Sequence, residues 1–130
     1  MFNFEKLEVW QKARNFVEEI YRFTSDFPEK ERFGLTQHIR KTAVSISSNI
    51  AEGTSRLSPL DFQRFIQIAM GSIREMVAQL YVALDIHYIQ KEAFEGLYKD
   101  CEELSKMLSG LSKSLNPRSA KSQLTTNSKL

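Results

Sequence analysis

The sequence predicts an all-α protein: an antiparallel up-and-down four-helix bundle over residues 1–116, followed by a polar and basic tail over residues 117–130 that we expect to be disordered. Apolar residues recur at spacings of three and four in four segments, which is the periodicity of amphipathic helices. No segment shows the strict alternation of a β-strand, and no second domain is visible. Because the connections are short, successive helices are expected to pack antiparallel.

The first two helices are expected over residues 4–25 and 33–53. Asn3 is the expected N-cap of the first helix, and Pro28 follows its end because the residue before a proline avoids the helical region. Its apolar stripe contains Leu7, Trp10, Ile20 and Tyr21. Gly53 is the expected C-terminal cap of the second helix, since glycine adopts the left-handed conformation that often ends a helix.

The third helix has the clearest start, with Ser58 as N-cap, Pro59 at the first helical position and Asp61 three residues after the serine. It is expected to reach about residue 86. Its predicted apolar face consists of Phe62, Phe65, Ala69, Met76, Leu80, Ala83 and Leu84.

The fourth helix is expected to begin at Lys91 and to stop before Pro117. Its apolar positions alternate threes and fours, as in the seam of a bundle helix, and comprise Phe94, Leu97, Cys101, Leu104, Leu108, Leu111 and Leu115. The core is predicted to depend on Trp10, Ile46, Phe65, Leu80 and Leu104.

The second helix carries apolar residues on two sides. Val44 and Ala51 lie on a helical wheel away from the core-facing isoleucines, with a polar seam between the two faces. A helix of this kind has two surfaces to pack against, such as its own bundle and a neighbouring subunit. The predicted seam and subunit interface comprise Arg40, Val44, Ser45, Asn49, Ala51, Glu52, Arg56, Ser72, Glu75 and Gln79. Glu75 and Gln79 are expected to pair with Arg40, Asn49 or Arg56, within one chain or between chains.

A family resemblance runs through this region. The stretch IRKTAVSISSNIAEG, the following SRLSPLDFQRFIQIAMGSIREMVAQL and the opening LEVWQKARNFVEEIY resemble the four-helix-bundle proteins encoded by intervening sequences in bacterial 23S rRNA genes. The resemblance covers roughly residues 4–115. It implies a ring-like homo-oligomer, typically a pentamer. The chain is also similar to the accessory variability protein of diversity-generating retroelements, which implies nucleic-acid binding.

The distribution of charge along the chain is compatible with nucleic-acid binding. The net charge is +2, but residues 32–84 hold six bases and three acids, which gives 6 − 3 = +3. The surface candidates for phosphate contacts are Arg32, Lys41, Arg64, Arg74, Arg118 and Lys121. Solvated faces and intramolecular ion pairs are the alternative role for these bases. Along the chain, aromatic residues are not interleaved with bases as they are in single-strand stacking platforms.

No catalytic constellation is visible. The residues three before His38 and His87 are leucines, so the Glu-x-x-His motif of di-metal bundles is missing. The single cysteine, Cys101, fits the apolar stripe of a core helix. We therefore expect no enzyme activity, no cofactor and no metal. The acidic start of the chain and the lack of a long apolar run predict a cytoplasmic protein without a membrane partner.

Two functions are compatible with these features. The first is a non-catalytic oligomer that binds RNA or DNA, because a ring would multiply a modest positive patch on each subunit. The second is a structural or adaptor oligomer that binds a protein partner through its helices or rim, which needs no excess of positive charge. We favour the first.

Overall fold

The structure is a computed structural model, and it describes residues 1–116. The described part consists of the short 3₁₀ helices η1 (Asn3–Lys6) and η2 (Glu29–Glu31) and the α-helices α1 (Glu8–Thr24), α2 (Leu35–Thr54), α3 (Pro59–Asp85) and α4 (Lys91–Ser114). The four α-helices confirm the predicted all-α class. The predicted tail, residues 117–130, lies outside the described residues.

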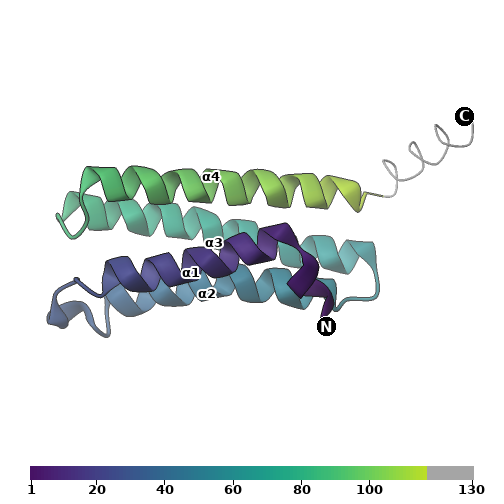
Figure 1. Cartoon of the computed structure of the whole chain (residues 1–130), viewed down its shortest axis with the longest axis horizontal. Coiled ribbons are helices and arrows are strands. Elements are labelled where there is room, and N and C mark those ends of the chain that lie inside the picture. The colour runs from purple at the N-terminus through teal and green to yellow at the C-terminus, as the bar shows by residue number, and fades with distance from the viewer. Residues whose placement is uncertain (117–130) are drawn as a thin grey trace, which may run out of the picture.

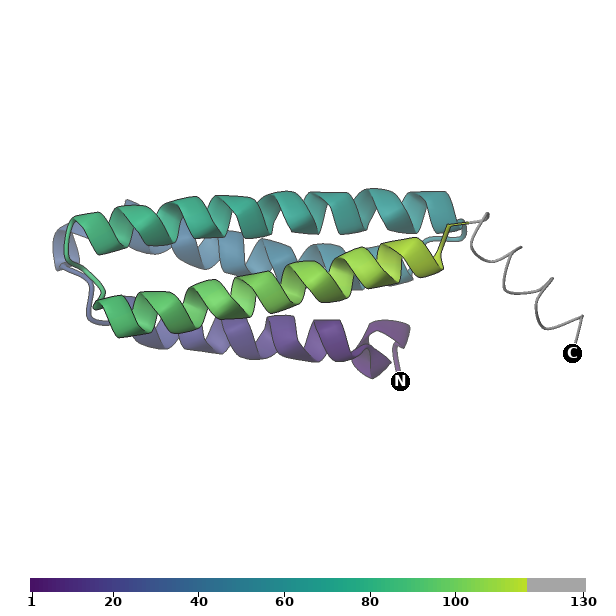
Figure 2. The same ribbon diagram turned by 90° about the horizontal axis from the view of Figure 1, so that it is seen from above.

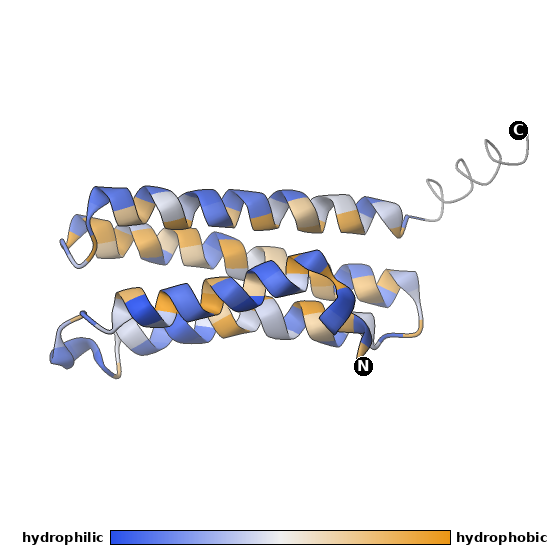
Figure 3. Cartoon of the chain, viewed as in Figure 1, coloured by the Kyte–Doolittle hydropathy of each residue, from blue (hydrophilic) through white to orange (hydrophobic). Residues whose placement is uncertain are grey.

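The four helices form an antiparallel up-and-down bundle in which each helix packs against two others (Figures 1 and 2). The α1–α2 and α3–α4 connections lie at one end, and the N-terminal segment lies at the other end with the α2–α3 connection. None of the helices among residues 1–116 carries an apolar stretch sufficient to span a membrane. Figure 3 shows hydrophilic residues along the visible sides of α1 and α4 and hydrophobic residues over much of α3.

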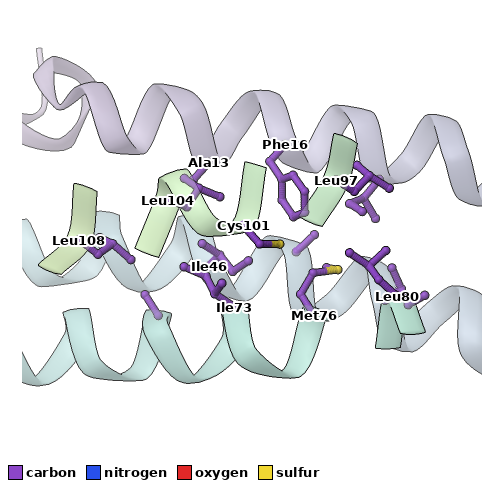
Figure 4. Packing of buried hydrophobic residues seen from close by; sticks show 14 of the residues in the cluster. Ala13, Phe16, Ile46, Ile73, Met76, Leu80, Leu97, Cys101, Leu104 and Leu108 are labelled. Atoms are coloured by element: carbon purple, nitrogen blue, oxygen red, sulfur yellow. The ribbon is translucent and has the colours of Figure 1, made fainter. Parts of the chain in front are cut away.

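All four helices contribute to one core. In Figure 4, Ala13 and Phe16 of α1 point toward Ile46, Met76 and Leu104 from the other helices. The other labelled core residues are Ile73, Leu80, Leu97, Cys101 and Leu108. This packing confirms Ile46, Leu80 and Leu104 as core residues, and it confirms Cys101 as a core thiol.

The predicted core was wrong at two aromatic positions. Trp10 and Phe65 are only partly buried. On α3, Ile66 and Ile73, which were not part of the predicted face, are buried together with the predicted Ala69, Met76, Leu80 and Ala83. The core-facing side of α3 therefore agrees with most of the predicted face, and the error lies near the start of the helix, where Ile66 is buried in place of Phe65. A large aromatic ring at the edge of a helix face can cover the rim of the core without entering it.

Two predicted helix caps were also wrong. Asn3 opens η1, whereas α1 begins at Glu8 with Leu7 as its N-cap. Gly53 lies inside α2, where a Cβ atom would come within 2.9 Å of the Phe62 ring. The glycine is thus required for the close approach of α2 and α3, and not for a left-handed cap.

The start of α3 agrees with the prediction, because the backbone N–H of Asp61 donates to Ser58 Oγ at 3.1 Å and Pro59 is the first helical residue. At the opposite end of the bundle, the Tyr88 hydroxyl donates to Glu31 Oε2 at 2.8 Å. The backbone N–H of Leu35 also donates to the Glu31 carboxylate, at 3.3 Å. Glu31 therefore ties the α3–α4 connection to the first turn of α2.

Candidate nucleic-acid interface

Three bases and two aromatic rings line an open groove between α1 and α2. Tyr21 comes from α1, Arg32 and Phe33 from the connection, and Arg40 and Lys41 from the first half of α2. The groove has a volume of about 520 Å³, and its remaining lining residues are Thr36, Gln37, Val44, Ser45 and Ser48. The residues from α2 share one side of the helix because they follow one another at spacings of three and four. We call this feature the basic groove.

Arg40 is held in place by α1. Its Nε donates to Thr24 Oγ1 at 2.8 Å, and its Nη2 donates to the Tyr21 carbonyl oxygen at 3.3 Å. The guanidinium carbon lies 4.5 Å from the centre of the Tyr21 ring, within the range of a cation–π contact. These two hydrogen bonds use two of the five guanidinium donors. Arg40 therefore brings a fixed positive charge to the wall of the groove.

The other two bases are more exposed. The Arg32 guanidinium lies 5.3 Å from the centre of the Phe33 ring and 3.5 Å from Glu29 Oε1. Lys41 is exposed, and within residues 1–116 no carboxylate lies within 4.0 Å of its ammonium group. Phe33 is 79% exposed, which is unusual for a large apolar ring.

The groove corrects one conclusion drawn from the sequence. Bases and aromatic residues are not interleaved along the chain, but folding places Tyr21 and Phe33 beside Arg32, Arg40 and Lys41. The prediction missed this because Tyr21 belongs to a different helix from the two bases of α2. The adjacent pair Arg32 and Phe33 was the only local signal.

The other described residues that were predicted to contact phosphate do not line the basic groove. Arg64 is exposed on the first turns of α3, with its Nη1 3.4 Å from Asp61 Oδ1. Arg74 lines a second groove, between α3 and α4, together with Tyr98 and Lys106. Arg118 and Lys121 lie outside the described residues. Of the four candidates that the structure describes, it therefore brings together only Arg32 and Lys41.

The polar seam between α2 and α3 contains a real network. Ser45 Oγ and Ser72 Oγ lie 2.9 Å apart, and Ser72 is buried. The side-chain amide of Asn49 donates to the Ser45 carbonyl oxygen at 2.8 Å and to Ser45 Oγ at 3.1 Å. The Ser45–Ser72 contact joins the two helices, and Asn49 holds the Ser45 hydroxyl from within α2.

The other predicted seam pairs are not formed within the chain. Gln79 donates to Glu75 on its own helix at 3.4 Å, and no base or amide of α2 reaches either residue. Arg40 turns toward α1, and Arg56 pairs with Glu52 at 2.7 Å. Arg56 also lies over the Phe65 ring at 4.5 Å. These arginines have nearer partners, so the predicted pairing with Glu75 and Gln79 was wrong within one subunit.

The two apolar residues predicted at a subunit interface lie outside the core. Val44 is 39% exposed and belongs to the basic groove. Ala51 is half-buried in a recess that it shares with Phe2 and Phe4 of the N-terminal segment. The chain's own N-terminal segment thus occupies part of this side of α2.

A more apolar surface, which the sequence reasoning missed, lies on the outer side of α3. It consists of Ile68 and Val82 of α3 and of Ile86, its C-cap residue, which are 44–48% exposed. At about 100° per residue these positions fall within one narrow stripe of the helix, on which Glu75 and Gln79 lie between Ile68 and Val82. We call it the α3 stripe.

The described residues offer little for covalent or metal chemistry. Burial raises the pKa of the Cys101 thiol to about 12, so the thiolate required of a nucleophile is scarce near neutral pH. Among residues 1–116, no group of three or more histidine, cysteine and carboxylate side chains is placed to hold a metal ion.

Comparison with known proteins relates the chain to one family. The family model described as 23S rRNA-intervening sequence protein matches residues 5–110. A similar solved structure is the crystal structure of a protein of unknown function from the S23 ribosomal protein family of Bacteroides thetaiotaomicron. That protein is 28% identical and aligns with a TM-score of 0.72, over 81% of this chain and 98% of that chain. No curated protein matches the chain.

Proposed function

The chain belongs to the family of 23S rRNA-intervening sequence proteins, and from this membership we propose that it is a non-catalytic, self-associating helical bundle that binds RNA or DNA. The observation that carries the proposal is the meeting of Arg32, Arg40 and Lys41 in the basic groove. Neighbouring cations attract phosphate groups and release the counterions that surround a nucleic acid.

Arg40 is the organising residue of this site. Because its side chain is already fixed by Thr24 and Tyr21, binding a phosphate there immobilises fewer torsions than binding to a mobile side chain. Lys41 and Arg32 supply more exposed cations on either side of it along the chain. Arginine can bind phosphate through two parallel hydrogen bonds, whereas lysine acts as a point charge.

Self-association would repeat this groove on every subunit. The surface best suited to it is the α3 stripe, where three exposed aliphatic side chains share one side of the helix with Glu75 and Gln79. A stable interface typically buries about 800 Å² on each partner, which requires more than this stripe alone. We therefore propose that the outer sides of α2 and α3 take part together. The family resemblance implies a ring, typically of five subunits.

The α3 stripe also favours a second candidate function, that of an adaptor which binds another protein. Exposed aliphatic residues on one side of a helix favour a protein contact and contribute nothing to phosphate binding. The two functions differ in their dependence on salt. Affinity for a phosphate backbone falls steeply with added salt, whereas apolar contacts are much less sensitive.

The proposal is tested by comparing two charge-reversal variants in a binding assay with fluorescently labelled RNA and DNA. Arg32→Glu/Lys41→Glu reverses two positive charges in the basic groove. Lys99→Glu/Lys113→Glu is the matched control, because it makes the same change of charge at exposed positions on α4, which does not contact α2. We expect the groove variant to lose most of its binding at low salt and the control to keep it.

Two outcomes would count against the proposal. Equal losses in both variants would mean that binding follows total charge and not the groove. If the parent protein binds neither RNA nor DNA at low salt, the nucleic-acid function fails, and the adaptor function becomes the better account.

A further inference from the structure

We infer that the basic groove recognises an unpaired nucleotide, with a base stacked on the Phe33 ring and the neighbouring phosphates bound by the three bases. The ligand would then be single-stranded RNA or DNA and not a duplex. This inference rests on the proposed function and specifies the class of nucleic acid that the same site takes.

The first argument is the exposure of Phe33. Its side chain is 79% exposed and lies at the entrance to α2, beside Arg32 and in the same groove as Arg40 and Lys41. Exposed aromatic rings beside cations are the elements of single-strand binding sites, since every base offers a flat face for stacking. In a duplex these faces are covered by neighbouring base pairs, so a ring at this position would have nothing to stack on.

The second argument is the composition of the remaining wall. Tyr21, 44% exposed, contributes a second ring from α1, and Arg40 already lies against it. An arginine stacked on an aromatic residue gives an extended flat surface against which a further ring can lie. The groove therefore has aromatic surface on α1 and at the start of α2.

The third argument is the presence of polar groups that are not used within the subunit. Gln37 and Ser48 line the groove, and within residues 1–116 their side chains make no hydrogen bond. Their donors and acceptors match the exposed edges of an unpaired base or a ribose hydroxyl. The volume of about 520 Å³ also falls in the range of about 300–1,000 Å³ that is usual for sites of small ligands.

The test uses one RNA sequence as a single strand and as a duplex, with the parent protein and with Phe33→Ala. We expect the parent to prefer the single strand. Phe33→Ala should weaken single-strand binding about 5- to 100-fold, the effect of losing one stacked base, and should leave duplex binding unchanged. Phe33→Trp should retain the preference. Leu57→Ala is the control, because Leu57 is fully exposed in the α2–α3 connection, away from the groove.

A second readout separates stacking from a structural effect. Single strands that carry the fluorescent base 2-aminopurine should be quenched on binding to the parent and to Phe33→Trp, and much less on binding to Phe33→Ala.

Several results would overturn the inference. If the parent binds both RNA forms equally and Phe33→Ala changes neither, the site binds phosphate alone, and the proposed function still stands. If Phe33→Ala changes the oligomeric state, Phe33 belongs to a subunit contact and the inference is wrong. If the parent binds no nucleic acid, the proposed function and this inference fail together.

Discussion

The guanidinium of Arg40 lies 4.5 Å from the centre of the Tyr21 ring, and this contact joins α2 to α1. Arg40 sits next to the polar seam in sequence, yet its hydrogen bonds go to Thr24 and to the Tyr21 carbonyl oxygen. The same contact that stabilises the α1–α2 pair also holds a cation beside two aromatic rings. The basic groove is thus built on a structural interaction of the bundle.

Leu104→Ala should destabilise the bundle by roughly 2–5 kcal/mol, because Leu104 is completely buried and truncation leaves a cavity. The free energy of unfolding in urea, followed by circular dichroism, measures this loss. Leu57→Ala is the matched control, since Leu57 is fully exposed and its truncation should change the stability little. A loss below about 1 kcal/mol for Leu104→Ala would show that α4 does not supply the core.

The Ser45–Ser72 hydrogen bond should appear as a coupling energy in a double-mutant cycle. Each serine-to-alanine change should cost about 1 kcal/mol, and the coupling should be about 0.5–1 kcal/mol, because the two hydroxyls interact directly at 2.9 Å. Ser47→Ala is a control, since its hydroxyl bonds only to a carbonyl of its own helix. Additive losses in the double variant would mean that the two hydroxyls do not stabilise each other.

Tyr88→Phe should make the stability of the protein less dependent on pH at both ends of the range. The hydrogen bond from Tyr88, with that from the Leu35 backbone, lowers the pKa of Glu31 below its ordinary value of 4.5. Because the pKa of Glu31 is lower in the folded chain than in the unfolded chain, its hydrogen bonds stabilise the fold at pH values above the unfolded-state pKa. This stabilisation is lost as the pH falls through the pKa of Glu31 in the folded state.

The same hydrogen bond raises the pKa of Tyr88 above 10.0, so its contribution is also lost as the pH rises through that raised value. The difference in stability between the parent and Tyr88→Phe should therefore be largest at pH values between the pKa of Glu31 and the pKa of Tyr88. It should shrink in strong acid and in strong base. Unfolding curves measured across the pH range give this difference directly. A constant difference at all pH values would rule out the Glu31–Tyr88 hydrogen bond as its source.

Ile68→Arg/Val82→Arg should dissociate the proposed oligomer, because two charges would replace exposed aliphatic side chains of the proposed contact. Light scattering should give a mass several times the 15.0 kDa of the chain for the parent and the single-chain mass for the variant. The helical signal should be retained, since both side chains are about half-exposed. A parent protein that is already monomeric at micromolar concentration would contradict self-association.

Local signals in the sequence predicted the fold well. The start of α3 depends on Ser58, Pro59 and Asp61, which are close neighbours in the chain, and the apolar spacing of α4 identified its buried residues correctly. The errors occurred where distant segments decide the structure. Gly53 was read as a cap because its contact with Phe62, from the next helix, is not visible in the local pattern.

The candidate site was less predictable for the same reason. Arg32 and Lys41 were expected at the surface, but no local pattern indicated that Tyr21 would lie beside Arg40, which is 19 residues away. The choice between Phe65 and Ile66 as the buried residue before Ala69 was also open, because both fit the spacing of three or four residues.

Photo-crosslinking of 4-thiouridine RNA to the intact protein, with the sites identified by mass spectrometry, tests the central claim most directly. The basic groove should yield crosslinks at Tyr21 and at Phe33, and these should disappear in Arg32→Glu/Lys41→Glu. Tyr98 provides an internal comparison, because it lines the second groove with Arg74 and Lys106. Crosslinks at Tyr98 in place of Tyr21 and Phe33, or none at any aromatic residue despite binding, would contradict the account.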